Sequence, residues 1–445
     1  MALRGEMAAA NSAGARGLAE TVPGKVQRKL VPLLFALYLV AFLDRINIGF
    51  AALEMNRDLH LSAGSFGVAA GMFFLGYFFF EVPSNLLMLR TGARKWIARI
   101  MVSWGLVAMA TIFARGAYSL YLLRFLLGVA EAGFFPGVAL YLTYWLPADR
   151  IASTVAMILS AASCAGIVGG PLSGALLGLS GCMGLAGWQW LFLLEGMPAV
   201  ILGFVVLCLW IEDPAHAPWL DAQERDWLRE RLRHEHSQKA SGPRHMGEAV
   251  ANPRVWLLSV QYFAIGLGNY GINMWLPQML KSFGRLSSMQ VGLLSAIPFS
   301  ASAVGVITIA WSADRRREYR WHLAGPALMG AGGLLALAQL HTPALSLLTL
   351  SLAIACAHGA VGPFWSMPSS FMVGNANAGG IALINSMGNL GGFAGPWVVG
   401  LLKRHTPSFA PALRALALSL VVAALGALAM PRVPLARRSG SAPES

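Results

Sequence analysis

Charged residues are scarce in this sequence. Asp, Glu, Lys and Arg make up 12% of its 445 residues, whereas 56% are hydrophobic and the mean hydropathy is +0.60. A soluble domain usually contains about twice that charged fraction, and a water-soluble fold of this length could not bury so much apolar sequence. The low charge therefore excludes a soluble protein and predicts one embedded in a membrane.

Cysteine is rare as well, and its spacing does not suit disulfides or metal sites. Cys164, Cys182, Cys208 and Cys356 form no C-x-x-C pair and no other metal-ligand pattern. The sequence also lacks a nucleophile–base–orienter set and a cofactor fingerprint. We therefore expect no disulfide, no bound metal, no cofactor and no enzymatic activity.

Acidic residues are fewer than basic ones, 20 against 33, which gives a formal net charge of +13. In a soluble protein this excess would suggest a nucleic-acid partner. Here the basic residues lie in short segments between apolar runs, without the aromatic-interleaved basic face of nucleic-acid binders. The excess therefore indicates membrane topology, and no nucleic-acid partner is expected.

What the sequence does contain is a series of long apolar runs. A helix needs about 20 apolar residues to cross the hydrocarbon core of a bilayer. The runs that qualify are roughly 31–52, 66–89, 95–114, 119–145, 152–179, 188–211, 254–277, 290–313, 322–341, 344–368, 378–402 and 410–430. They predict an all-α membrane protein with twelve transmembrane helices.

A polar segment divides these runs into two sets of six. Its charged stretch, Trp219 to Glu235, has apolar residues at helical spacing, which predicts a helix on the cytoplasmic surface. The expected parts of the chain are 1–30, 31–211, 212–253, 254–430 and 431–445. The second and fourth are the six-helix halves, the third is the central loop, and the first and last are cytoplasmic ends.

A weak repeat relates the two halves. Gly170-Pro171 in the fifth run matches Gly395-Pro396 in the eleventh, six runs later. Pseudo-symmetric halves with matched glycine and proline features are typical of secondary transporters, whose substrate site lies between the repeats. A channel or a receptor would not require this symmetry.

The basic residues predict the orientation. With the N-terminus inside, 24 of the 33 Lys and Arg residues lie in cytoplasmic segments, seven lie in the opposite loops, and Arg45 and Arg124 lie inside helices. Cytoplasmic loops of membrane proteins carry such an excess of basic residues. We therefore expect a multi-pass protein of the inner membrane with both termini in the cytoplasm.

Two of the predicted helices each contain an arginine and an acidic residue well inside the span. Asp44 and Arg45 belong to the first helix, whereas Arg124 and Glu131 lie seven residues apart on one face of the fourth. Each such charge costs at least about 2.5–3.5 kcal/mol in a bilayer unless it is paired or hydrated. Charges at this depth favour a functional site.

The chemistry of the four residues suggests coupled binding of protons and a small organic anion. The arginines offer planar, bidentate sites for a carboxylate. If Asp44 and Glu131 take up protons, the cluster acquires a positive net charge and attracts an anion, and loss of the protons reverses this. The alternative is a static set of ion pairs that joins the first helix to the fourth.

Other polar groups inside the spans leave more than one interpretation open. Glu81 and Glu195 lack an obvious cationic neighbour and suit a structural or a functional role equally. A buried histidine is more often a hydrogen-bonded core residue than a proton carrier, and we favour the first interpretation for His358. The candidate substrate contacts, which are also suited to interhelical hydrogen bonding and packing, are Tyr77, Gln261, Trp365, Ser366 and Asn385.

Several motifs together resemble one known group. The run Phe42-Leu43-Asp44-Arg45-Ile46-Asn47 resembles the F-L-D-R-x-N signature of the anion:cation symporter family within the major facilitator superfamily. The run from Arg124 to Pro136 is similar to that family's R-F-x-x-G-x-x-E-A-G-x-x-P. Further similar runs are Gly76–Asn85, Phe364–Pro368 and Gly380–Pro396. The family includes bacterial tartrate, phthalate, hydroxyphenylacetate and sugar-acid permeases.

The resemblance implies proton-driven uptake of a carboxylate by alternating access in a major facilitator fold, and we expect a monomer. It assigns Asp44 and Glu131 to proton coupling, Arg45 and Arg124 to the anion, and Tyr77, Gln261, Trp365 and Asn385 to substrate contact. Asn85 and Leu89 replace the Gly and Asp of the superfamily's loop motif, so a charge-relay gate is not expected there.

Two other functions stay open. A proton-coupled exporter of the same superfamily is compatible with the Gly-Pro pattern of the fifth helix, which resembles an antiporter motif. A transport-derived sensor would need a cytoplasmic output domain, and segment 212–253 is too short to form one.

Overall fold

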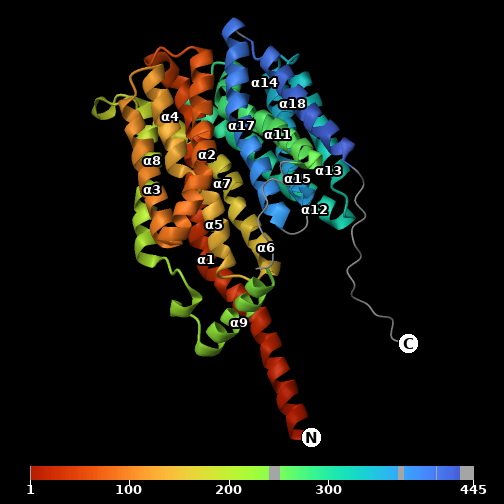
Figure 1. Ribbon diagram of the computed structural model, residues 1–445. Coiled ribbons are helices and arrows are strands. Elements are labelled where there is room, and N and C mark those ends of the chain that lie inside the picture. The colour runs from red at the N-terminus through yellow and green to blue at the C-terminus, as the bar shows by residue number, and fades with distance from the viewer. Residues whose placement is uncertain (1, 240–250, 369–374, 407, 431–445) are drawn as a thin grey trace. The chain divides into compact units, whose positions relative to one another are not determined.

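The computed structural model describes residues 2–239, 251–368, 375–406 and 408–430, and these residues are mostly helical (Figure 1). The predicted cytoplasmic tail 431–445 lies outside the described residues, as do residues 240–250 of the predicted central segment. Within the described ranges there is no β-strand. The all-α class predicted from the apolar runs is therefore confirmed.

The chain forms two compact units, Met1–Gly242 with Leu276–Ala296 and Pro243–Trp275 with Ile297–Ser445. The helices of the first unit are α1 (Ala2–Asp58), α2 (Ala63–Thr91), α3 (Ala93–Ala110), α4 (Ala117–Glu131), α5 (Phe134–Thr143), α6 (Ala148–Leu159), α7 (Ala161–Leu177), α8 (Gly187–Leu209) and α9 (Ala222–Lys239). Those of the second are α13 (Arg320–Leu337), α14 (Pro343–Gly359), α15 (Val361–Ser366), α17 (Asn375–His405) and α18 (Ala410–Ala429). Two further helices, α11 (Pro253–Ser282) and α12 (Ser288–Arg316), contribute residues to both units.

Each predicted span coincides with one helix or with two consecutive helices. Nine helical segments in the described part of the chain are long and apolar enough to cross a membrane. The other three predicted spans are occupied by α11, α13 and α17. The predicted surface stretch, Trp219 to Glu235, overlaps α9. The boundaries given for the parts of the chain remain predictions.

The first helix is longer than its apolar run. The run predicts a start near residue 31, whereas α1 begins at Ala2 and continues through Pro23 and Pro32. The preceding stretch is rich in alanine, which has the highest helix propensity. The Nζ atom of Lys25 lies 2.6 Å from Oε2 of Glu224, so an ion pair ties this extension to α9.

The fourth span is interrupted directly after Glu131. Ala132 has an extended ψ of 133°, and Gly133 has a φ of +84°, which only glycine adopts easily. A Cβ atom on Gly133 would also lie 2.5 Å from Oγ of Ser84 on α2. The single helix predicted over 119–145 is therefore two helices, α4 and α5, and Glu131 is the last residue of α4.

Small residues let α2 and α4 approach closely. A Cβ atom on Gly76 would lie 2.2 Å from the carbonyl oxygen of Phe125, and one on Gly128 would lie 2.0 Å from that of Phe73. In a bilayer such contacts replace the hydrophobic effect as the source of helix association. The contact places Phe73 and Tyr77 of α2 beside the charged residues of α4.

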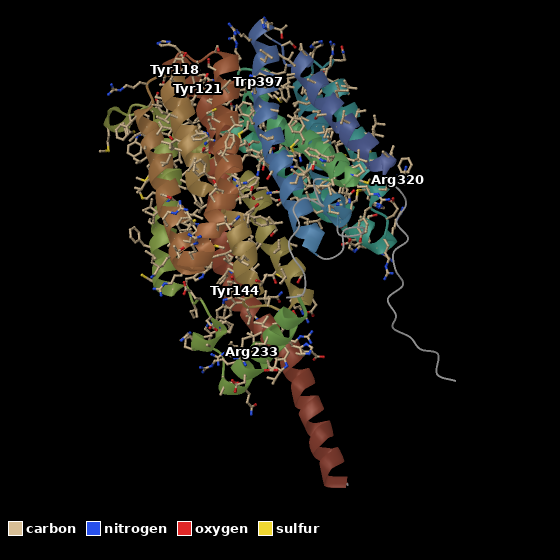
Figure 2. All side chains as sticks on the ribbon, in the orientation of Figure 1. Tyr118, Tyr121, Tyr144, Arg233, Arg320 and Trp397 are labelled. Carbon is tan, nitrogen blue, oxygen red and sulfur yellow. The ribbon has the colours of Figure 1, made fainter. Side chains whose placement is uncertain are left out.

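The outward faces of the helices are apolar. Leu106, Ile201 and Phe204 of the first unit are more than half exposed, which is expected of side chains that face lipid. Figure 2 shows Tyr118 and Tyr121 at one end of the α4–α5 pair and Tyr144 at the other. Amphipathic rings at both ends of a span are typical of the two membrane–water interfaces.

The second unit has its own core. Helix α13 packs against α14 and α18, and α17 packs against α18. Fully buried side chains such as Leu323, Phe364 and Ile384 form one hydrophobic cluster, against which Tyr262 and Trp365 pack while remaining partly exposed. One of the predicted substrate contacts, Trp365, therefore packs against this cluster.

Gly128→Ala should destabilise the protein by about 1–3 kcal/mol, because the added methyl group overpacks the α2–α4 contact. The matched control is Gly332→Ala on α13, where a Cβ atom meets nothing within 4 Å, and it should keep or raise the stability. Thermal unfolding of the purified proteins in detergent measures the difference. Equal melting temperatures for the two variants would contradict the close contact between α2 and α4.

Candidate functional site

The four predicted intramembrane charges all lie in the first unit. Asp44 and Arg45 are on α1, and Arg124 and Glu131 are on α4. Asp44 is 1% exposed, and Arg124 and Glu131 are 0% exposed, so water does not reach them from the surface. The side chain of Arg45 keeps 12% exposure. Burial of this kind is costly for charged groups, so their partners decide what the site can do.

Arg45 and Glu131 form a buried ion pair. The Nε and Nη2 atoms of Arg45 both donate to Oε1 of Glu131, at 2.8 and 2.5 Å. The other carboxylate oxygen, Oε2, is buried and has no hydrogen-bond partner among the described residues. The pair joins α1 to the C-terminal end of α4, and breaking such a pair from one side typically costs about 3–5 kcal/mol.

Asp44 is held by neutral donors. The indole Nε1 of Trp104 on α3 donates to its Oδ2, and Nδ2 of Asn47 donates to its Oδ1 at 3.1 Å. Trp104 is fully buried. A carboxylate held in this way keeps its position without an arginine hydrogen-bonded to it, so Asp44 leaves both guanidinium groups available to other partners.

Arg124 is the unusual member of the group. Its Nε, Nη1 and Nη2 atoms are all buried, and none has a hydrogen-bond partner in the described ranges. Asp44 and Glu131 attract it electrostatically and Arg45 repels it. A guanidinium group has five N–H donors in a fixed fork that fits a carboxylate. Arg124 is therefore a buried cation with unused bidentate donor capacity.

Two aromatic rings of α2 complete the surroundings of the arginines. The Cζ atoms of Arg45 and Arg124 each lie 5.4 Å from the centroid of the Phe73 ring. The Cζ atom of Arg45 also lies 5.4 Å from the centroid of Tyr77. Cation–π attraction at this distance stabilises a guanidinium without using its N–H groups. The sequence predicted Tyr77 but not Phe73, although the two are four residues apart on one helix face.

Glu195 adds a third acid near this group. It lies on α8, is 3% exposed, and its Oε1 accepts a hydrogen bond from Oγ of Ser173 at 2.8 Å. The sequence predicted no cationic neighbour for Glu195, and the hydroxyl group that donates to it is neutral. Glu81, on α2, is also buried.

The remaining predicted contacts lie in the second unit. Gln261 is buried, and its Nε2 donates to the carbonyl oxygen of Ala423 at 3.0 Å, so it links α11 to α18. Trp365 packs edge-to-face on Tyr262, with ring centroids 4.9 Å apart. Asn385 lies half-buried on α17.

Ser366 and His358 also belong to this unit. Ser366 ends α15, and its side chain hydrogen-bonds to Tyr319. Nδ1 of His358 lies 2.6 Å from Oγ of Ser302, and its Nε2 lies 3.3 Å from Nδ2 of Asn273. Both ring nitrogens thus have partners, as the prediction of a hydrogen-bonded core histidine requires.

The chain matches the family model of the Major Facilitator Superfamily over residues 34–396. It is 46% identical over 411 residues to a protein of Agrobacterium vitis named "Putative tartrate transporter", covering 92% of this chain and 94% of that protein. It is 42% identical over 390 residues to the quinolone resistance transporter of Acinetobacter baumannii, covering 86% of this chain and 89% of that protein.

The fold has solved counterparts. The crystal structure of a D-xylose–proton symporter has a TM-score of 0.73 and 15% sequence identity, and the match covers 91% of this chain and 98% of that one. The family model and the Agrobacterium vitis relative are those of transporters rather than enzymes, and they fit the superfamily and the symporter family that the motifs predicted. The chain is a multi-pass membrane transporter with the twelve-helix fold, and it belongs to the major facilitator superfamily.

Proposed function

We propose that this transporter carries a small organic carboxylate into the cell together with protons, by alternating access. The observation that carries the proposal is Arg124, a fully buried guanidinium group without a hydrogen-bond partner in the described residues, beside two buried carboxyl groups. A static structural role would pair this cation, as Arg45 is paired with Glu131. Arg124 instead has a free bidentate fork, which suits an incoming carboxylate.

Proton binding supplies the driving force in this proposal. With both acids ionised, Asp44 and Glu131 balance the two arginines, so the site has little attraction for an anion. Protonation of Glu131 removes the charge that holds Arg45 and frees its Nε and Nη2 donors. The site then offers two guanidinium groups to one anion. Because linkage is reciprocal, bound anion also raises the affinity for protons.

Release follows from the same coupling. When the protons leave toward the cytoplasm, Glu131 recaptures Arg45 and the negative charge of Asp44 again balances Arg124. The anion loses its partners and leaves. A carrier of this type resets only after proton release, so substrate accumulates at the expense of the proton gradient.

One relative supports a small organic acid as the substrate. The Agrobacterium vitis protein is named "Putative tartrate transporter". Excess basic residues in the predicted cytoplasmic segments support an inner-membrane location with both termini inside. We expect a monomer, since each chain contains both six-helix halves, with the bilayer and the small anion as its partners and protons as the coupling ion.

Export is the second candidate. The Acinetobacter baumannii relative is a quinolone resistance transporter by name. The same charge cluster would serve export if proton influx drove an anionic drug outward. Inverted membrane vesicles distinguish the two directions, because an acidic interior drives a proton-coupled exporter to fill them and a symporter to empty them.

Arg124→Lys should reduce uptake at least about tenfold while the protein still reaches the membrane, because lysine keeps the charge and loses the planar fork. Arg150→Lys is the matched control, since Arg150 is exposed on α6 and lies beside the exposed Asp149. Uptake of radiolabelled carboxylates by whole cells measures both. Uptake like that of the wild type in Arg124→Lys would remove this residue from the anion site.

Asp44→Asn and Glu131→Gln imitate the protonated acids, so they should separate binding from coupling. Each variant should still exchange substrate across proteoliposome membranes when substrate is present on both sides. Neither should accumulate substrate in response to an imposed pH gradient, because its site cannot release the proton that resets the carrier.

A static clamp between α1 and α4 predicts a different result for the same two variants. Loss of an ionic partner would then lower expression and abolish exchange and accumulation together. Accumulation driven by the pH gradient in both variants would show that neither acid carries the coupling proton.

A further inference from the structure

Glu195 is a buried acid with one satisfied and one unsatisfied oxygen. Oγ of Ser173 on α7 donates to its Oε1 at 2.8 Å, and both residues are nearly inaccessible to solvent. Its Oε2 atom is buried and has no partner in the described part of the chain. A buried acceptor without a hydrogen-bond partner destabilises the fold, and a charged one does so more strongly. An ionised carboxylate therefore fits this position poorly.

Asn47 connects Glu195 to the proposed proton site. Its Nδ2 donates to Oδ1 of Asp44 at 3.1 Å, and its side chain also lies within hydrogen-bonding reach of Glu195. Its own Oδ1 is buried and unsatisfied among the residues that the structure describes. Helix α1, which carries Asn47, packs against both α7 and α8. One amide side chain thus lies between two buried acids.

A single proton would satisfy both leftover acceptors. Among the described residues, neither Oε2 of Glu195 nor Oδ1 of Asn47 has a hydrogen-bond partner, and an ionised carboxylate provides no donor of its own. If Glu195 takes a proton on Oε2, the new O–H group can donate to Oδ1 of Asn47, which continues to donate to Asp44. The amide group of Asn47 then couples the protonation of Glu195 to the protonation of Asp44.

The charged surroundings favour the same arrangement. From α1, the ionisable group that acts on Glu195 is Asp44, whose negative charge opposes a second charge nearby. Of the other helices packed against α8, α7 presents the neutral Ser173 to Glu195, and Trp104 of α3 is hydrogen-bonded to Asp44. The charges of α4, Arg124 and Glu131, act on Asp44.

We propose that Glu195 is a third proton-binding residue, linked to Asp44 through Asn47, so that its protonation sets the proton affinity of Asp44. The step is the binding of one proton from solution to a carboxylate oxygen, and no other bond changes. The inference rests on the proposed proton-coupled function. Glu195 acts through Asp44 and is a positioning residue rather than an anion ligand.

The test uses Glu195→Gln in the full-length protein. Glutamine keeps an oxygen for Ser173 and places an N–H group where the proposed O–H lies, so the fold should survive with an unchanged melting temperature. The pH profile of uptake should become less steep and move to lower pH, because Asp44 no longer has an ionisable neighbour. Asn47→Leu, which keeps both acids but cuts the link, should also change the profile. Ser419→Ala, a buried serine of the second unit bonded to the carbonyl oxygen of Leu416, should not.

A second measurement does not depend on transport. Infrared spectroscopy of the purified wild-type protein at neutral pH should show the C=O stretch of a protonated carboxyl group that is absent from Glu195→Gln. Asp44→Asn should change the pH at which this band titrates. An unchanged pH profile in Glu195→Gln, or a spectrum in which no such band is lost, would overturn the inference. If the band behaves as expected while the wild type ignores a pH gradient, the proposed function fails and the proton site stands.

Discussion

The burial of Arg124 is the constraint on which the rest of the first unit depends. A guanidinium group cannot shed its charge, so the fold must surround it with compensating charge and with π faces while leaving its N–H groups unused. Asp44 and Glu131 supply the charge, and Phe73 supplies the ring. Gly128 permits the close contact between α2 and α4 that holds this ring in place.

The two arginines are not equivalent, and this asymmetry links protons to the anion. Arg45 is paired with Glu131, whereas Asp44 is held by Trp104 and Asn47 and, among the described residues, takes no hydrogen bond from a guanidinium group. One arginine is therefore available before proton binding and the second only after it. If both acids were paired to arginines, binding of the anion would have to break two buried ion pairs, each costly to open. In the observed arrangement, binding of the anion has to break only one ion pair, that of Arg45 with Glu131.

The sequence predicted those features that follow from composition or from the cost of burial. Long apolar runs predicted the helices, and the expense of charge in a bilayer singled out the four ionisable residues. It did not predict which acid pairs with Arg45, because that depends on the rotation of α1 relative to α4. Trp104 and Phe73 were missed since aromatic residues in apolar runs resemble lipid-facing ones. The helix break after Glu131 depends on Gly133, whose positive φ is a property of the fold around Ser84.

The central claim is that anion binding at Arg124 and proton binding at the nearby acids are one coupled event. The direct test uses the purified protein in a lightly buffered detergent solution with a pH indicator, to which a carboxylate that the protein accumulates is added. The account predicts that protons disappear from solution as the carboxylate binds, that the amide of the same compound neither binds nor takes up protons, and that Glu131→Gln binds the carboxylate with fewer protons. Saturable binding without any proton uptake, at a pH at which the protein accumulates the carboxylate, would contradict it.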